Sequence, residues 1–107
     1  MYLESNSIMQ LKTREESGYL FCFDEKEKEL ENGQKIFIYE AIRTPLYYTY
    51  DLLVSLIIME KYPDDNMQAV INNYLLENDN TEHEEEFKQM QSWRKHAKEI
   101  AKQILEH

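Results

Sequence analysis

Residues 35–59 read KIFIYEAIRTPLYYTYDLLVSLIIM and change character at Pro45. Before it, residues 35–39 are β-branched and aromatic, which is typical of a strand. After it, apolar residues recur at the three- and four-residue spacing of a helix. Thr44 and Pro45 suit the N-cap and the first helical position, because the N–H that proline lacks has no acceptor there. We therefore predict an α+β protein whose strands come first and whose first helix begins at Pro45.

Two more strand signals lie upstream of this boundary. Residues 7–13 alternate weakly between apolar and polar side chains, and residues 18–23 read GYLFCF. Polar turns separate the three strand signals from one another. We predict a three-stranded antiparallel meander over about residues 7–40.

The charged segment 24–31 allows two interpretations. Asn32 and Gly33 tolerate positive φ and are a strong signal for a two-residue hairpin turn, which would make the segment an extended, solvent-exposed ribbon. Alternatively the segment is a short helix with Gly33 at its C′ position. We favour the ribbon.

Three helices are predicted downstream, at about residues 45–61, 65–77 and 81–104. They should pack as a small helical layer and complete a single α+β domain over residues 1–104. Residues 105–107 read LEH, which we take as the remnant of an expression tag.

The last of these helices has the clearest pattern. Thr81 and Glu84 match a capping box, in which each side chain bonds the other's backbone N–H. Its apolar residues form one stripe at helical spacing. They are Phe87, Met90, Trp93, Ala97, Ile100 and Ile104.

The charge balance excludes several classes of partner. The 107 residues carry 12 Lys and Arg against 21 Asp and Glu, a formal net charge of -9. Such a chain repels duplex nucleic acid and anionic membrane surfaces. Its longest apolar stretch, residues 46–59, contains Asp51 and is shorter than the roughly 20 residues of a membrane span. We expect neither partner.

The compartment is predicted from the single cysteine and the N-terminus. Cys22 cannot form an intrachain disulfide, and no signal-peptide pattern follows Met1. We therefore expect a cytoplasmic protein. Abundant Lys, Glu, Asn, Ile and Tyr suggest an AT-rich bacterial or phage genome.

Signals for catalysis are weak. The two isolated glycines cannot form a phosphate-binding loop, and no zinc-protease or EF-hand pattern is present. We interpret Cys22 as a core residue and His96 as a solvated one. A small metal-dependent enzyme remains the third alternative. One helical turn of acids and an imidazole could supply some of its ligands, and a defined site would need others from elsewhere in the chain. The residues of that turn are Glu82, His83, Glu85 and Glu86, for which a dipole-matched helix start is the simpler explanation. We predict no catalytic residue, cofactor or metal.

An excess of apolar surface is the best functional lead. The helix after Pro45 is apolar around most of its circumference, and a three-stranded sheet with two short helices would not cover it. Tyrosine is enriched at protein interfaces, since it combines a large contact area with a polar tip. We predict a non-catalytic interaction module that binds another protein or a second copy of itself. The candidate partner-binding residues are Tyr47, Tyr48, Tyr50, Val54, Ile58 and Trp93.

An acidic inhibitor that imitates nucleic acid is the alternative. Residues 77–86 contain six acids and no Lys or Arg, and residues 24–31 contain five acids against two lysines. Such blocks could occupy the binding groove of a basic DNA- or RNA-binding protein. A complex of that kind should weaken steeply with salt, because charges are screened within about 10 Å at 0.1 M.

Overall fold

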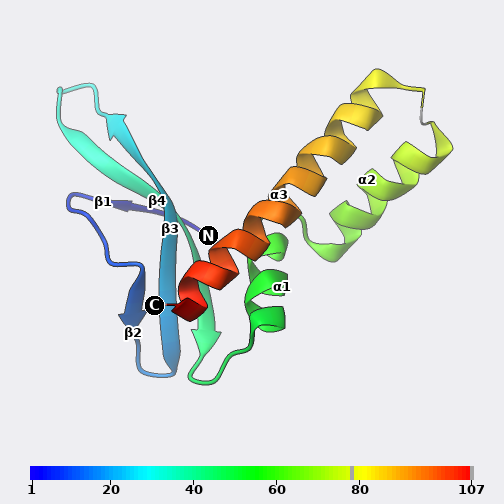
Figure 1. Cartoon of the computed structure of the whole chain (residues 1–107). Helices are drawn as coiled ribbons and strands as arrows, with labels where there is room; N and C mark the ends of the chain where they lie inside the picture. The colour runs from blue at the N-terminus through cyan, green and yellow to red at the C-terminus, as the bar shows by residue number, and fades with distance from the viewer. Residues whose placement is uncertain (78, 107) are drawn as a thin grey trace. The chain divides into compact units, whose positions relative to one another are not determined.

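The computed structural model describes residues 1–77 and 79–106 (Figure 1). The described residues form an α+β structure, with a four-stranded antiparallel sheet and three helices. The chain divides into two compact units, Met1–Thr49 and Tyr50–Glu106. The elements are β1 (Tyr2–Ser5), β2 (Lys12–Arg14), β3 (Gly18–Glu29), β4 (Lys35–Pro45), α1 (Tyr50–Lys61), α2 (Asp64–Leu76) and α3 (Thr81–Glu106).

The sheet has the strand order β1-β4-β3-β2. The long β3–β4 hairpin is its centre, and the ribbon interpretation of residues 24–31 is confirmed, because β3 continues to Glu29. The turn is wider than the expected two residues. The N–H of Leu30 donates to the carbonyl of Gln34 at 2.7 Å, and Gly33 has a φ of 84°.

The prediction of three strands is wrong by one. The missed strand is β1, whose four residues pair with β4 and place Tyr2 opposite Glu40. The N–H of Ala41 also donates to the carbonyl of Met1 at 2.7 Å. Of the strand predicted at residues 7–13, only β2 is formed. A short edge strand depends on the partner that completes its ladder, so its own residues carry little signal.

The helix predicted from Pro45 begins at Tyr50 instead. Pro45 is the Cα partner of Gly18, so pairing with β3 extends β4 through the predicted cap. The Thr44 hydroxyl donates to the carbonyl of Pro45 at 3.0 Å, which is not a capping bond. A proline also disfavours helical φ/ψ angles for the residue that precedes it, which fits the position of Thr44 in a strand.

Asn80, rather than Thr81, caps α3. Its Oδ1 accepts hydrogen bonds from the N–H groups of Glu82 at 3.0 Å and His83 at 3.3 Å. Asparagine is as good a cap as threonine, so the cap lies one residue before the predicted one and the helix starts at Thr81. At the other end, α3 continues through Leu105 and Glu106 of the predicted tag remnant, and His107 lies outside the described residues.

The first unit buries side chains on both faces of its sheet. On one face a buried cluster gathers Leu20, Cys22, Tyr39 and Ala41. The Tyr39 hydroxyl accepts from the Met9 N–H at 2.8 Å and donates to Glu25 at 2.6 Å. Burial raises the pKa of the Cys22 thiol, which keeps it protonated and unreactive.

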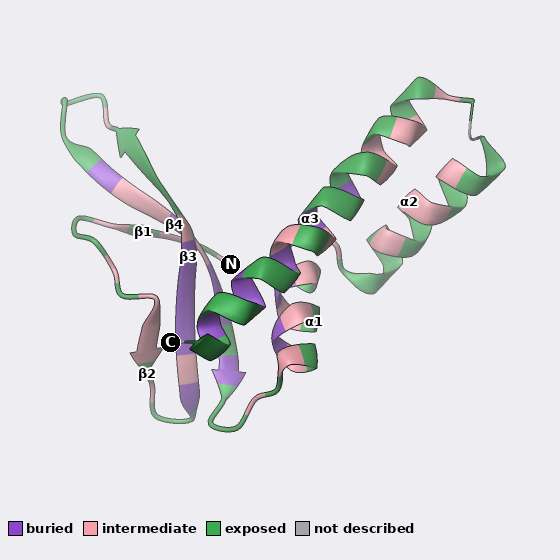
Figure 2. Ribbon diagram, in the orientation of Figure 1, coloured by how far each residue is buried: buried purple, intermediate pink, exposed green. Residues whose placement is uncertain are grey.

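The second unit is built on the predicted stripe of α3. Met90, Trp93, Ala97, Ile100 and Ile104 are all buried, together with Ala101. In α1 the buried residues are Leu53 and Ile57. The indole N–H of Trp93 donates to the carbonyl of Ile57 at 3.0 Å, which ties α3 to α1. Figure 2 shows this buried stripe on α3 and α1 and only intermediate or exposed residues on α2.

Asp24 gives a first testable prediction. It has a φ of 54°, where β3 carries an irregularity between Phe23 and Lys26. Asparagine tolerates this left-handed conformation and a β-branched residue does not. We expect Asp24→Asn to change the free energy of unfolding by no more than about 0.5 kcal/mol and Asp24→Val to lower it by about 1–2 kcal/mol. Urea unfolding followed by circular dichroism measures both, and equal stability of the two variants would contradict the prediction.

Candidate functional site

The predicted partner-binding residues are divided between the two units. Tyr47 and Tyr48 lie in the loop after β4; Tyr47 is 91% exposed, whereas Tyr48 packs edge-on against Phe21 with 5.4 Å between ring centroids. In the second unit, the structure brings together a half-buried strip on α1 and places the sixth residue in the core. The strip is Tyr50, Val54 and Ile58, and the core residue is Trp93.

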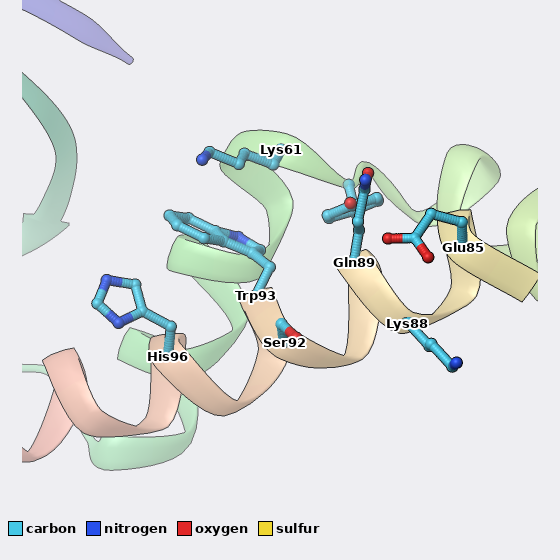
Figure 3. Close-up of a pocket in the computed structure, with 8 residues that line it drawn as sticks. Lys61, Glu85, Lys88, Gln89, Ser92, Trp93 and His96 are labelled. Carbon is cyan, nitrogen blue, oxygen red and sulfur yellow. The ribbon is translucent and has the colours of Figure 1, made fainter.

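A hollow of about 580 Å³ lies between the end of α1 and the middle of α3 (Figure 3). It collects more cationic groups than acids, which is unusual in a chain of net charge -9. It is lined by Lys61, Tyr62, Glu85, Lys88, Gln89, Ser92, Trp93 and His96.

Both ammonium groups of the hollow already have partners within the chain. The Lys61 ammonium lies 4.0 Å from the centroid of the Trp93 ring, and the Lys88 ammonium lies 3.2 Å from a carboxylate oxygen of Glu84. The imidazole of His96 and the hydroxyl of Ser92 do not point toward one another (Figure 3). The hollow is therefore best explained as the seam where α1 packs on α3, with no nucleophile and base brought together in it.

The acids and the imidazole that the metal-dependent alternative would use do not converge. Among residues 1–77 and 79–106, no three His, Cys, Asp or Glu side chains are grouped so as to hold a metal ion. The imidazole Nε2 of His83 instead lies 3.3 Å from a carboxylate oxygen of Glu77. Its Nδ1 is buried without a hydrogen-bond partner in the described part of the chain. His83 thus belongs to the contact between the end of α2 and the start of α3.

The large apolar side chains with the highest exposed fractions in the second unit lie at the end of α2. Within the described chain α2 contains no buried residue, although the ring of Tyr74 stacks on Phe87 at 4.2 Å and nearly parallel. Leu75 is 68% exposed and Leu76 is 83% exposed. With the half-buried Ile71 and Tyr74, these two leucines form what we call the α2 tip patch.

This patch was not predicted from the sequence. The signal was the dipeptide Leu75-Leu76, because two consecutive helical residues point about 100° apart and together present a broad apolar arc. Within the described residues neither leucine is covered, since both are more than two-thirds exposed.

The segment that contains the α2 tip patch is strongly acidic. Residues 62–87 contain eight Asp and Glu and no Lys or Arg. Glu77, Asp79 and Glu82 are exposed around the turn between α2 and α3, next to the two leucines in the chain. The local field is therefore more negative than the net charge of the whole protein suggests.

Comparisons of the chain with family models, with curated proteins and with solved structures found no match. Among the described residues, no helix combines the length and the apolar character that a membrane span requires. The function of the protein is therefore inferred from its own residues.

Proposed function

We propose that this chain is a small acidic, non-catalytic protein–protein interaction module, such as an adaptor, assembly or regulatory protein. The observation that supports this function is the exposure of Leu75 and Leu76, at 68% and 83%, on a helix with no buried residue in the described chain. Contiguous exposed apolar surface is disfavoured in water and marks interaction sites in proteins.

The α2 tip patch is the main contact surface in this proposal. The α1 strip of Tyr50, Val54 and Ile58 is a second candidate contact, because its side chains are only half-buried. We place the protein in the cytoplasm, where the buried, protonated thiol of Cys22 needs no partner.

Capture of partners by matched baits tests the proposal. The baits are the wild-type chain, Leu75→Ser/Leu76→Ser, and the control Ile8→Ser/Leu46→Ser, which removes two exposed apolar side chains from the first unit. The baits are incubated with a lysate of the cells from which the protein comes. We expect the wild type and the control to retain the same proteins. The Leu75→Ser/Leu76→Ser bait should not retain them. Melting temperatures should be similar for all three baits, since the substituted side chains are exposed.

Two outcomes would contradict the proposal. In one, the Leu75→Ser/Leu76→Ser bait retains every protein that the wild type retains. In the other, the wild type captures no protein and light scattering shows a strict monomer. Either result would mean that the exposed leucines have no partner to cover them.

Acidic mimicry of nucleic acid is the second candidate function, favoured by the eight acids without a base over residues 62–87. In that case charge alone carries the complex, so the leucine substitutions would leave capture unchanged. The captured protein would be basic, and modest salt would release it.

A further inference from the structure

We propose that the α2 tip patch binds a positively charged amphipathic helix of another protein. This inference rests on the proposed function and adds the chemistry of the partner. Its starting point is the local shape of the second unit. The Tyr74 ring stacked on Phe87 joins α2 to α3, and Leu75 lies one helical turn beyond Ile71 on α2.

An apolar strip of this kind suits a helical partner. Ile71 and Leu75 stand at a four-residue spacing, and Leu76 widens the strip on its exposed side. The ridges of a partner helix pack into such rows when its own apolar residues recur at three and four. A partner with one apolar stripe along a helix fits this row of side chains.

Charge complementarity decides the rest of the partner's composition. Glu77, Asp79 and Glu82 are exposed and follow the leucines in the chain, and residues 62–87 contain no Lys or Arg. The Glu77 carboxylate lies 3.3 Å from the imidazole of His83, so Asp79 and Glu82 are the main acids available to a partner. A partner helix whose apolar stripe is flanked by Lys or Arg would neutralise these carboxylates on docking. An acidic helix would place like charges opposite these carboxylates. A neutral helix would remove water from them without supplying a compensating charge.

The same charges argue against a second copy of this chain as the occupant. A twofold contact through the α2 tip patch would bring Glu77, Asp79 and Glu82 of one copy close to the same residues of the other. Like charges opposed at an interface disfavour association. The exposed leucines favour binding of a partner, and the acidic residues favour a partner of opposite charge.

Two synthetic peptides test this inference on the full chain. One is a fluorescently labelled peptide of leucine and lysine, about 18 residues or five helical turns long, with its leucines on one face. The other has the same composition in an order that scatters the leucines around the helix. Fluorescence anisotropy gives both affinities. We expect the amphipathic peptide to bind about tenfold tighter than the scattered one.

Matched variants separate the contribution of the leucines from that of the charges. Leu75→Ser/Leu76→Ser should abolish the tenfold preference while leaving weak binding of both peptides. Asp79→Asn/Glu82→Gln should weaken both peptides and reduce the dependence of binding on salt between about 0.05 and 0.3 M. The control Glu27→Gln/Glu29→Gln removes two exposed carboxylates from β3 and should leave the preference unchanged.

Three results would overturn the inference. They are equal binding of the two peptides, an unchanged preference in Leu75→Ser/Leu76→Ser, and a wild-type dimer in light scattering that this double variant abolishes. The last result would identify a second copy as the occupant. If lysate capture depends on the leucines while the peptides are not distinguished, this inference fails and the proposed function stands. If capture is also independent of the leucines, both fail.

Discussion

Gly18→Ala is expected to lower the free energy of unfolding by about 3 kcal/mol, which is the upper end of the usual cost of overpacking. A Cβ at this position would lie 1.8 Å from the carbonyl oxygen of Thr44 and 2.8 Å from its carbonyl carbon. Both are backbone atoms of β4, so no side-chain rotation can relieve the clash. Since Gly18 is buried and pairs with Pro45, β3 and β4 would have to separate at this end.

Urea unfolding followed by circular dichroism measures this effect. Gly33→Ala is the informative comparison, because a Cβ there meets nothing within 4 Å but the φ of 84° is strained for alanine. We expect it to cost only about 1 kcal/mol. The exposed neighbour Ser17→Ala should stay within about 0.5 kcal/mol of the wild type. The close approach of β3 and β4 would be refuted by a Gly18→Ala variant as stable as Ser17→Ala.

Trp93→Ala is expected to lower the free energy of unfolding of the second unit by about 3–5 kcal/mol. The side chain is 8% exposed and fills the contact between α1 and α3. Its indole N–H donates to the carbonyl of Ile57 at 3.0 Å. Truncation therefore removes both a large buried apolar surface and the hydrogen bond that joins the two helices.

Two further variants divide this effect into its parts. Trp93→Phe keeps most of the apolar volume and loses the donor, so it should cost about 1–2 kcal/mol. Lys61→Met removes only the ammonium group above the ring, which should cost about 0.5–1 kcal/mol. The helical circular dichroism signal measures all three. If Trp93→Ala were no less stable than Lys61→Met, Trp93 would not be a core residue.

Trp93 shows what a sequence pattern leaves open. It was predicted both as part of the apolar stripe of its helix and as a candidate partner-binding residue, and in the structure it lies in the core against α1. Periodicity identifies which residues of a helix share a face. It does not say whether that face meets another part of the chain or another protein. The exposure of Leu75 and Leu76 was not predicted for the same reason, since helical spacing does not say which face of a helix is covered.

Local signals were sufficient wherever an element depends on its own residues. The α+β class, the existence of all three helices, the buried stripe of α3 and the extended ribbon were all predicted correctly, because helical periodicity and a hairpin turn signal act over a few residues. The predicted cap of α3, Thr81, lies one residue from the observed cap, Asn80, since threonine and asparagine are both good N-caps.

Tertiary structure decided the features that depend on distant residues. β1 exists because Tyr2–Ser5 pairs with a strand about 35 residues later in the chain, and β4 reaches Pro45 because Gly18 stands opposite it. The exposure of the α2 tip patch likewise depends on how much of α2 the rest of the second unit covers. Strand pairing and burial are properties of two surfaces in contact, and a single stretch of sequence contains only one of the two.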